Sequence, residues 1–223
     1  MSKEIIGTNR VRLSGEVVSN PTLSHVLHEE EFYEFNLAVE RLSEHRDVLP
    51  VVISNKVSGF ETIAIGNKLS IKGQFRSYNK AENEKSKLIL SVFCKELLEF
   101  NNAINPNEIY LSGFVCKAPI YRTTPFNREI CDVLIAVNRG HNKSDYLPLI
   151  AWGRNARHAS DFAVGDPIEI VGRIQSREYE KRIGDEIIKK VAYEISVNQI
   201  GGADLERGQT INIKKQKLYA ENV

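Results

Sequence analysis

The sequence predicts an all-β protein with short helices, in which one small barrel occurs twice in tandem. Three observations predict this fold: an internal repeat, segments in which polar and apolar residues alternate or β-branched residues dominate, and glycines inside those segments. A chain of 223 residues is long enough for two domains with separate cores. Its content of 42% hydrophobic and 26% charged residues is typical of a folded chain without long disordered segments.

The repeat runs through most of the chain with an almost constant period. Matching residues lie 98 positions apart at first and 99 positions apart later, which indicates a one-residue insertion in the second copy. This period is too long for a solenoid and fits duplicated domains. The matches are Leu13-Ser14-Gly15 with Leu111-Ser112-Gly113, Pro21 with Pro119, Ala38-Val39 with Ala136-Val137, Arg41 with Arg139, Leu49-Pro50 with Leu147-Pro148, and residues 66–77 with residues 165–176.

Each copy contains five segments with strand character, and the second copy has room for a helix of about two turns over Asn155–Phe162. Five strands with a helix after the third is the order of the OB fold, so we predict two five-stranded OB-fold barrels. The segments are Arg10–Val18, Tyr33–Arg41, Val48–Asn55, Lys68–Tyr78 and Lys87–Phe93, followed by Glu108–Cys116, Arg128–Asn138, Leu147–Trp152, Pro167–Tyr179 and Ile187–Val197.

Glycines and polar segments indicate where the chain bends. Interior glycines such as Gly73 and Gly172 weaken a flat strand, so they predict bends where a small barrel turns a corner. The acidic runs at 29–31 and 82–85 are expected in hairpin loops. The polar segment 101–106 ends in proline and predicts a linker. The expected domains are residues 1–106, residues 107–200 and a C-terminal extension, 201–223, in which Thr210–Ile213 alternates as an added strand would.

Composition and missing motifs exclude several classes of protein. There is no run of about 18 apolar residues and no signal-peptide core, so we expect a cytoplasmic protein without a membrane segment. Cys94, Cys116 and Cys131 form an odd set without a C-x-x-C pair, and all three are expected to be buried. No catalytic or phosphate-binding motif occurs, so neither an enzyme nor a metal or other cofactor is expected. The net charge of +1 means that any basic surface must arise by local segregation of charges.

Four segments of the second copy together form a recognisable pattern: Tyr121-Arg122-Thr123-Thr124-Pro125, Ile135-Ala136-Val137-Asn138-Arg139, residues 145–153, and Gly172-Arg173-Ile174-Gln175-Ser176-Arg177-Glu178-Tyr179. On these segments the second copy resembles the bacterial single-stranded DNA-binding protein family over nearly all of residues 107–200. The first copy looks like a diverged member that keeps residues 37–41 and 66–77. The resemblance implies sequence-independent binding of single-stranded DNA, by base stacking on aromatic rings and neutralisation of phosphates, to protect the strand in replication, repair or recombination.

Matched by position to the family, the stacking aromatics of the second copy are Tyr146, Trp152 and Tyr179. The same positions in the first copy hold Val48, Ser54 and Lys80, so the second barrel is expected to carry most of the affinity for DNA. Tyr78 and Phe75 are candidate substitutes in the first barrel. The expected phosphate contacts are Arg122, Arg128, Arg139, Arg154, Arg173, Arg177 and Lys181.

Several alternatives stay open at this point. Trp152 follows an apolar run and is equally well explained as a core residue, and arginines are common on any solvated strand face. A protein adaptor would bury Trp152 and scatter the basic residues; a primosome-type accessory protein would also bind a helicase or its loader. RNA is a further alternative ligand, because stacking does not distinguish the sugars.

The resemblance also bears on assembly and partners. Family members commonly assemble four OB domains, so two barrels per chain imply a homodimer. Members also commonly end in an acidic tip that recruits replication and repair proteins. Residues 214–223 contain three lysines and one glutamate, so recruitment by that route is not expected.

Overall fold

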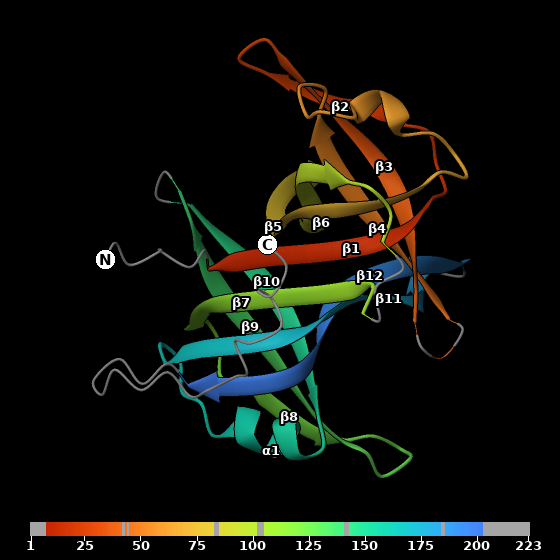
Figure 1. The fold of residues 1–223 in the computed structure, drawn as a ribbon. Coiled ribbons are helices and arrows are strands. Elements are labelled where there is room, and N and C mark those ends of the chain that lie inside the picture. Colours follow the sequence, from red (N-terminus) through yellow and green to blue (C-terminus); the bar gives the residue numbers. More distant parts are fainter. Residues whose placement is uncertain are drawn as a thin grey trace, which may run out of the picture.

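The structure is a computed structural model that describes residues 8–41, 43, 45–82, 85–101, 105–140, 143–183 and 186–202. The expected extension from residue 203 onward, with its predicted strand Thr210–Ile213, lies outside the described residues. Figure 1 shows the two halves of the chain, one above the other, with β1 and β7 side by side between them. No helix in the described part of the chain is long and apolar enough to cross a membrane.

Each half of the chain closes into a barrel in the predicted strand order. In the first half, β3 pairs with β4, β4 with β6, β6 with β5, β5 with β1 and β1 with β3, which closes the ring; the second half repeats this order. The elements of the first half are β1 (Asn9–Val17), β2 (Thr22–Leu27), β3 (Glu30–Glu40), β4 (Arg46–Ser54), the 3₁₀ turn η1 (Phe60–Thr62), β5 (Lys68–Glu82) and β6 (Lys85–Leu98). Those of the second half are β7 (Asn107–Val115), β8 (Ile120–Thr123), β9 (Glu129–Arg139), β10 (Lys143–Trp152), the helix α1 (Arg154–Ser160), β11 (Pro167–Ile183) and β12 (Glu186–Gly202).

The short strands β2 and β8 were not predicted. β1 pairs with the end of β3 through Val17, and β2 continues along the same strand from Thr22. The first OB strand is therefore interrupted around Pro21, which has no amide hydrogen to donate to a ladder. Pro119 stands at the matching position before β8. Each barrel thus has five strands, of which the first is split in two.

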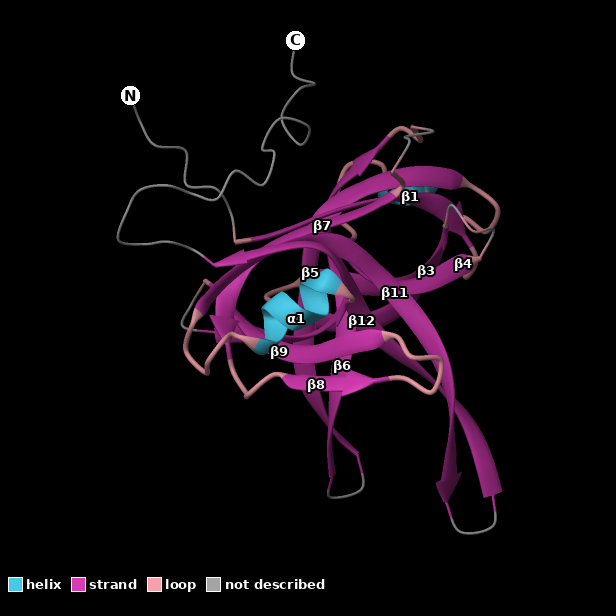
Figure 2. Cartoon of the chain, turned by 90° about the horizontal axis from the view of Figure 1, so that it is seen from below, coloured by secondary structure: helices cyan, strands magenta, loops and turns pink. Residues whose placement is uncertain are grey.

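Two further sequence predictions were wrong in detail. Glu30 and Glu31 begin β3 and are not in a loop; the turn before them is His28-Glu29, where both residues have positive φ. Glu82 and Lys85 likewise end β5 and begin β6. The hairpins are longer than predicted because pairing continues almost to their tips, and Figure 2 shows the β11–β12 hairpin projecting well beyond its barrel.

The glycines inside strands allow close contact between backbones. A Cβ added at Gly73 would collide with the carbonyl oxygen of Phe93, and one at Gly172 with that of Ser196. Each glycine also lies opposite a β-bulge in its partner strand. The register shifts between Lys72 and Gly73, where β6 has the extra residue Lys95, and between Val171 and Gly172, where β12 has the extra residue Asn198. The glycines that were predicted to mark barrel corners thus stand where a bulged partner strand passes close to the backbone.

Beyond each bulge an asparagine side chain replaces a missing backbone partner. The Nδ2 of Asn9 donates to the carbonyl oxygen of Phe75 (2.7 Å), and its Oδ1 accepts from the amide of the same residue (2.9 Å). Asn107 makes the same two bonds with Ile174 at 2.7 and 2.9 Å. Both amides are buried, and each satisfies one donor and one acceptor of the strand.

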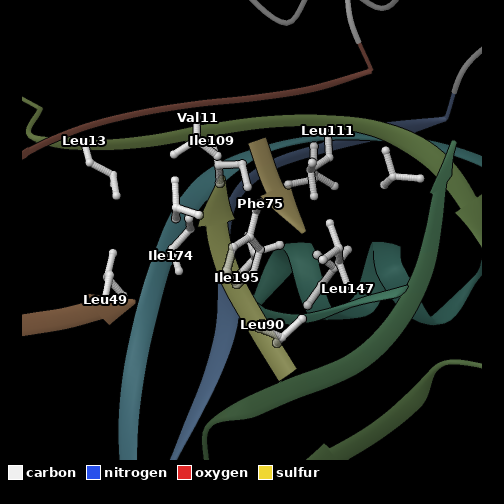
Figure 3. Close-up of a cluster of buried hydrophobic side chains, with 14 of the residues drawn as sticks. Val11, Leu13, Leu49, Phe75, Leu90, Ile109, Leu111, Leu147, Ile174 and Ile195 are labelled. Atoms are coloured by element: carbon white, nitrogen blue, oxygen red, sulfur yellow. The ribbon is translucent and has the colours of Figure 1, made fainter. Parts of the chain in front are cut away.

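The apolar core runs through both barrels without a break. Figure 3 shows Val11, Leu13 and Phe75 from the first barrel close to Ile109 and Leu111 from the second. These side chains are almost completely buried, because β1 and β7 bring the two interiors together. Phe75 is 1% exposed, so the idea that it stacks on a base was wrong.

β1 and β7 join the barrels by antiparallel pairing in a symmetric register. Val11 pairs with Ile109, its own counterpart in the repeat, and the pairs on either side exchange counterparts in the same way. Two identical subunits make this kind of contact across a two-fold axis. The chain therefore contains, within one polypeptide, an interface of the homodimer type.

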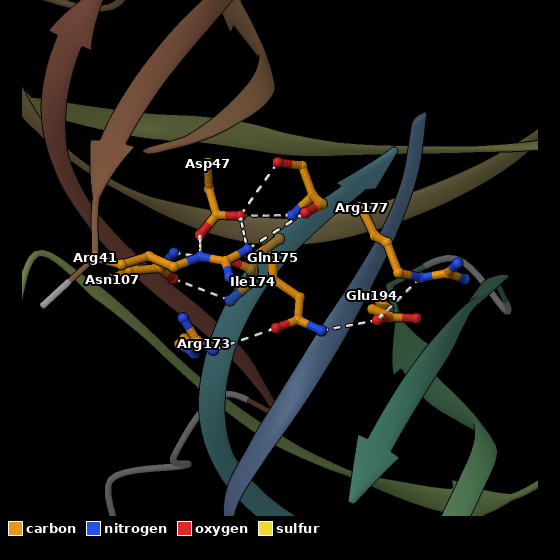
Figure 4. A network of polar contacts seen from close by, with 9 residues as sticks. Arg41, Asp47, Asn107, Arg173, Ile174, Gln175, Arg177 and Glu194 are labelled. Carbon is orange, nitrogen blue, oxygen red and sulfur yellow. Dashed lines mark hydrogen bonds and ion pairs between the residues drawn. The ribbon is translucent and has the colours of Figure 1, made fainter. Parts of the chain in front are cut away.

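A buried carboxylate of the first barrel holds the long hairpin of the second. Asp47 accepts hydrogen bonds from the amide (2.7 Å) and the hydroxyl (3.1 Å) of Ser176 in β11, as Figure 4 shows. The guanidinium of Arg41 pairs with the same carboxylate at 2.6 and 2.7 Å. Asp47 is fully buried, and its charge is compensated by these contacts.

The second barrel makes the mirrored contact with the first. Asp145, also buried, accepts a hydrogen bond from the amide of Ser77 in β5 (2.8 Å) and pairs with Arg139 at 3.1 Å. The hydroxyl of Ser77 in turn accepts a hydrogen bond from the backbone amide of Tyr146 (2.7 Å). The two barrels are thus fixed to each other at both ends of the β1–β7 junction.

Asp47→Asn is expected to lower the free energy of unfolding at neutral pH by about 2 kcal/mol or more, because Arg41 then loses its charge partner in a buried contact. Burial raises the pKa of Asp47, but hydrogen bonds from Arg41 and Ser176 outweigh it and hold that pKa below its ordinary value. A lowered pKa in the folded state gives stability that is present above the unfolded pKa of about 3.9 and is lost as the pH falls through the folded value.

Urea unfolding of wild type and variant at neutral pH and between about pH 4 and pH 2 measures both effects. The variant should be less stable at neutral pH and should lose less stability in acid. Glu40→Gln, which removes an exposed ion pair with Arg46, is the matched control. Equal stability of Asp47→Asn and wild type at neutral pH would contradict the assigned role.

The cysteines give a second test of the fold. Cys94 and Cys131 are buried as predicted, but Cys116 is only partly buried, which corrects the expectation that all three would be hidden. Burial raises the pKa of all three thiols, that of Cys94 to about 12. Since the thiolate is the reactive form, a thiol reagent at pH 8 should label one cysteine slowly in the folded protein and three in urea. Cys116→Ser should abolish the folded-state labelling; rapid reaction of all three would contradict this fold.

Candidate nucleic-acid interface

The outer face of β10 carries two of the three predicted aromatic residues. Tyr146 and Trp152 point away from the barrel, on the face opposite the buried Leu147 and Leu149, and are 46% and 39% exposed. Six residues of extended strand place them roughly 20 Å apart. The alternative that Trp152 is a core residue does not hold at this exposure. Gly153, with φ of 54°, ends the strand directly after Trp152 and begins α1.

β11 presents the third aromatic residue on the same surface. Tyr179 is 37% exposed, and the guanidinium carbon of Arg177 lies 5.8 Å from its ring centre. Alternation along β11 puts Arg173, Arg177, Tyr179 and Lys181 on one side of the strand. β12 pairs with β11 on one edge and with β10 on the other, so the face of β11 continues through β12 to Trp152 and Tyr146.

The predicted basic residues fall into three groups by their contacts. Arg128, Arg154 and Lys181 are exposed, and no carboxylate within the described residues pairs with them. Arg122 is cross-strand from Ile130, which is cross-strand from Trp152, so it belongs to the same face; its guanidinium pairs with Asp132 at 2.8 Å. Arg177 approaches Glu194 at 3.8 Å, as Figure 4 shows.

Arg139 and Arg173 form the third group, because they lie near the junction of the barrels. Arg139 follows the inward-facing row of β9 and pairs with the buried Asp145. Arg173 is partly buried near Arg41, and burial, together with this neighbouring charge, lowers the pKa of its guanidinium. Both side chains therefore have a role in the protein itself, whatever contact they make with a ligand.

The second barrel has a surface hollow that was not expected from the sequence. Trp152 and Arg128 line it together with Thr123, Asn127, Glu129 and Gly153. An aromatic wall beside an unpaired cation is the combination that holds a base and its phosphate. Sequence reasoning missed the hollow because its lining comes from the β8–β9 turn and from the end of β10.

The first barrel has its own aromatic residues, but they cover one another. The rings of His25 and Phe32 stack at 4.8 Å, Phe32 lies 5.9 Å from Phe93, and the guanidinium carbon of Arg76 lies 3.6 Å from the Phe93 ring centre. Burial and the charge of Arg139 lower the pKa of Arg76 to about 10. Tyr78 is the one predicted substitute that is open to solvent, at 46%.

Within the described residues there is no group of three or more His, Cys, Asp or Glu side chains that could hold a metal ion. The side chains that the outer face of the second barrel presents include the aromatic rings and basic groups described above. Two OB barrels, one with exposed aromatics and cations across its outer face, define a protein of the oligonucleotide-binding OB class.

Known proteins point to the same class. The sequence model of the single-strand binding protein family matches residues 106–202, which is the copy that carries the resemblance. Single-stranded DNA-binding protein 1 of Lactococcus lactis subsp. lactis (strain IL1403) is 30% identical over 122 residues, which cover 49% of this chain and 81% of that protein. The single-stranded DNA-binding protein of Clostridium tetani (strain Massachusetts / E88) is 30% identical over 115 residues, 48% and 79% of the two chains. This chain belongs to the single-strand binding protein family.

The wild-type single-stranded DNA binding protein from Thermus aquaticus has a similar crystal structure. Its TM-score is 0.69 at 18% sequence identity, and the match covers 92% of this chain and 97% of that chain. At this identity the likeness shows the fold alone. The predicted fold class and the family resemblance are both confirmed.

Arg139→Ala and Arg154→Ala should separate the structural from the surface arginines. Removing Arg139 leaves Asp145 buried without its charge partner, so the free energy of unfolding should fall by about 2 kcal/mol. Arg154 lies exposed at the start of α1, and its removal should change stability by less than about 0.5 kcal/mol. Urea unfolding measures both, and equal effects would contradict the division.

Proposed function

We propose that this protein binds single-stranded DNA without sequence preference and that the outer face of its second barrel holds the strand. Bases stack on Tyr146, Trp152 and Tyr179, and phosphates are neutralised by the surrounding basic side chains. The protein has no catalytic step in this role, and it acts in the cytoplasm, where it shields exposed strands during replication, repair or recombination. The domains that carry the role are residues 1–106 and 107–200.

The observation that carries this proposal is the exposure of three aromatic rings on one continuous face. An aromatic ring is normally the first candidate for a protein core, and here three rings on β10 and β11 are 37–46% exposed. Every base has a π face, so such rings bind any sequence, at about 1–3 kcal/mol per base. An adaptor that binds only protein was expected to bury Trp152, so its exposure favours the nucleic acid.

The basic residues support the proposal through their distribution. Arg128 and Arg154 lie next to Trp152, in the hollow and at the start of α1, while Arg177 and Lys181 flank Tyr179. Arg122 lies two strands from Trp152 and can exchange Asp132 for a phosphate. Arg139 and Arg173 assist by fixing the junction and by adding positive charge beside it.

Two chains are proposed to assemble into a homodimer with four barrels. The β1–β7 contact lies within one chain, so the support is the family resemblance, which implies four OB domains per assembly, of which one chain supplies two. Replication and repair proteins are the proposed partners of this assembly.

The test is fluorescence polarisation with labelled oligo-dT at low and moderate salt. A variant with Tyr146, Trp152 and Tyr179 changed to alanine should bind about a hundredfold more weakly or worse, since each lost stack removes about 1–3 kcal/mol. Wild-type affinity should fall with salt as phosphate contacts release counterions.

The matched control is Tyr78→Ala, which removes the exposed tyrosine of the first barrel and should have little effect. Strong loss with Tyr78→Ala and none with the triple variant would place the strand on the first barrel. No binding of wild type to oligo-dT would refute the proposal. An oligo-U competitor in the same assay tests RNA, and equal competition would extend the ligand class to it.

A further inference from the structure

The β8–β9 turn presents an aromatic ring to solvent. Phe126 is 86% exposed, the highest value among the large hydrophobic residues of the described chain. Three hydrogen bonds close the turn: Thr124 N to Arg128 O and Asn127 N to Thr124 O, both 2.9 Å, and Arg128 N to Thr124 Oγ1, 3.1 Å. Asn127 takes the left-handed conformation, with φ of 57°, which asparagine tolerates. The ring is therefore held away from the core by a well-bonded turn.

The two residues that follow Phe126 line the hollow next to Trp152. Arg128 contributes a cation without a carboxylate partner among the described residues. Glu129 is the one acidic residue that lines the hollow. Its carboxylate accepts a hydrogen bond from the hydroxyl of Tyr121 (2.6 Å) and forms an ion pair with Arg157 (3.6 Å). An anion near Arg128 is therefore attracted by the guanidinium of Arg128. The negative charge of Glu129 repels it little, because Arg157 compensates that charge.

A phenylalanine ring at this exposure adds almost nothing to the core, and it has no polar group to interact with water. It can, however, offer its face to a base, as the rings on β10 and β11 do in the proposed function. We propose that the β8–β9 turn is a further nucleotide site, in which Phe126 stacks on a base and Arg128 contacts the adjoining phosphate. The site rests on the proposed function and continues the strand beyond Trp152, around the rim of the barrel.

The first test compares Phe126→Ala and Arg128→Ala with Ile65→Ala. Ile65 is 58% exposed in the first barrel and is the matched control for loss of an exposed apolar side chain. With a long labelled oligo-dT, Phe126→Ala should weaken binding about tenfold, and Arg128→Ala should weaken it and reduce the salt slope by about one. Ile65→Ala should bind as wild type does, and all variants should keep the wild-type melting temperature.

The second test uses tryptophan emission, because Trp152 is the one tryptophan in the chain. Phe126→Trp adds a second indole at the turn, and saturation with oligo-dT should quench clearly more emission than in wild type. If the quenched emission equals that of wild type while the variant still binds, the added indole does not stack and the site is refuted.

The outcomes separate this site from the proposed function. Failure of wild type to bind oligo-dT would refute both. Wild-type binding that is unchanged in Phe126→Ala and Arg128→Ala would refute the site and leave the proposed function standing. A change in sedimentation of Phe126→Ala without a change in DNA affinity would show a contact between protein copies and would also overturn the site.

Discussion

The antiparallel pairing of β1 with β7 is the contact on which the rest of the structure depends. Val11 and Ile109 are counterparts in the repeat and pair with each other, so the contact has the symmetry of a dimer while it joins two parts of one chain. It covers an edge that each barrel would otherwise expose, and it merges the two cores into one. Because both halves are encoded separately, one half can change its outer face while the interface keeps its symmetry.

The buried carboxylates convert this pairing into a fixed orientation. Each of Asp47 and Asp145 reaches from one barrel to a serine in the long hairpin of the other. If β1 and β7 alone joined the barrels, one barrel could twist relative to the other. Charged hydrogen bonds on both sides of the junction restrict this motion. The contact through Ser77 also holds the backbone of Tyr146. In the proposed function Tyr146 would therefore lose little conformational entropy when a base stacks on it.

The repeat made the fold predictable, because its spacing is legible without any knowledge of contacts. Strand β2 escaped prediction because its six residues are all exposed and carry no alternation of buried and exposed positions. Phe75 points inward and Tyr78 outward by the ordinary alternation of β5, and which side of the strand faces the core depends on pairing that the sequence does not show. Asp47 and Asp145 are 98 residues apart, so the repeat contained that pair, but their serine partners lie across the junction and no local pattern indicates them. A single aromatic in a turn, such as Phe126, has no periodic signal at all.

The difference between the two outer faces follows from where each face places its aromatic rings. In the first barrel His25, Phe32 and Phe93 form a ladder that Arg76 covers, so most of their π faces are already occupied by one another. In the second barrel Trp152 has no such cover. Ile130 occupies the position that matches Phe32 of the first barrel, and Ser196 occupies the position that matches Phe93. The aromatic rings of the first barrel thus pack against one another, whereas those of the second barrel leave their faces open to solvent. In the proposed function the open face of the second barrel is the one that holds the strand, because its aromatic rings are not engaged with one another.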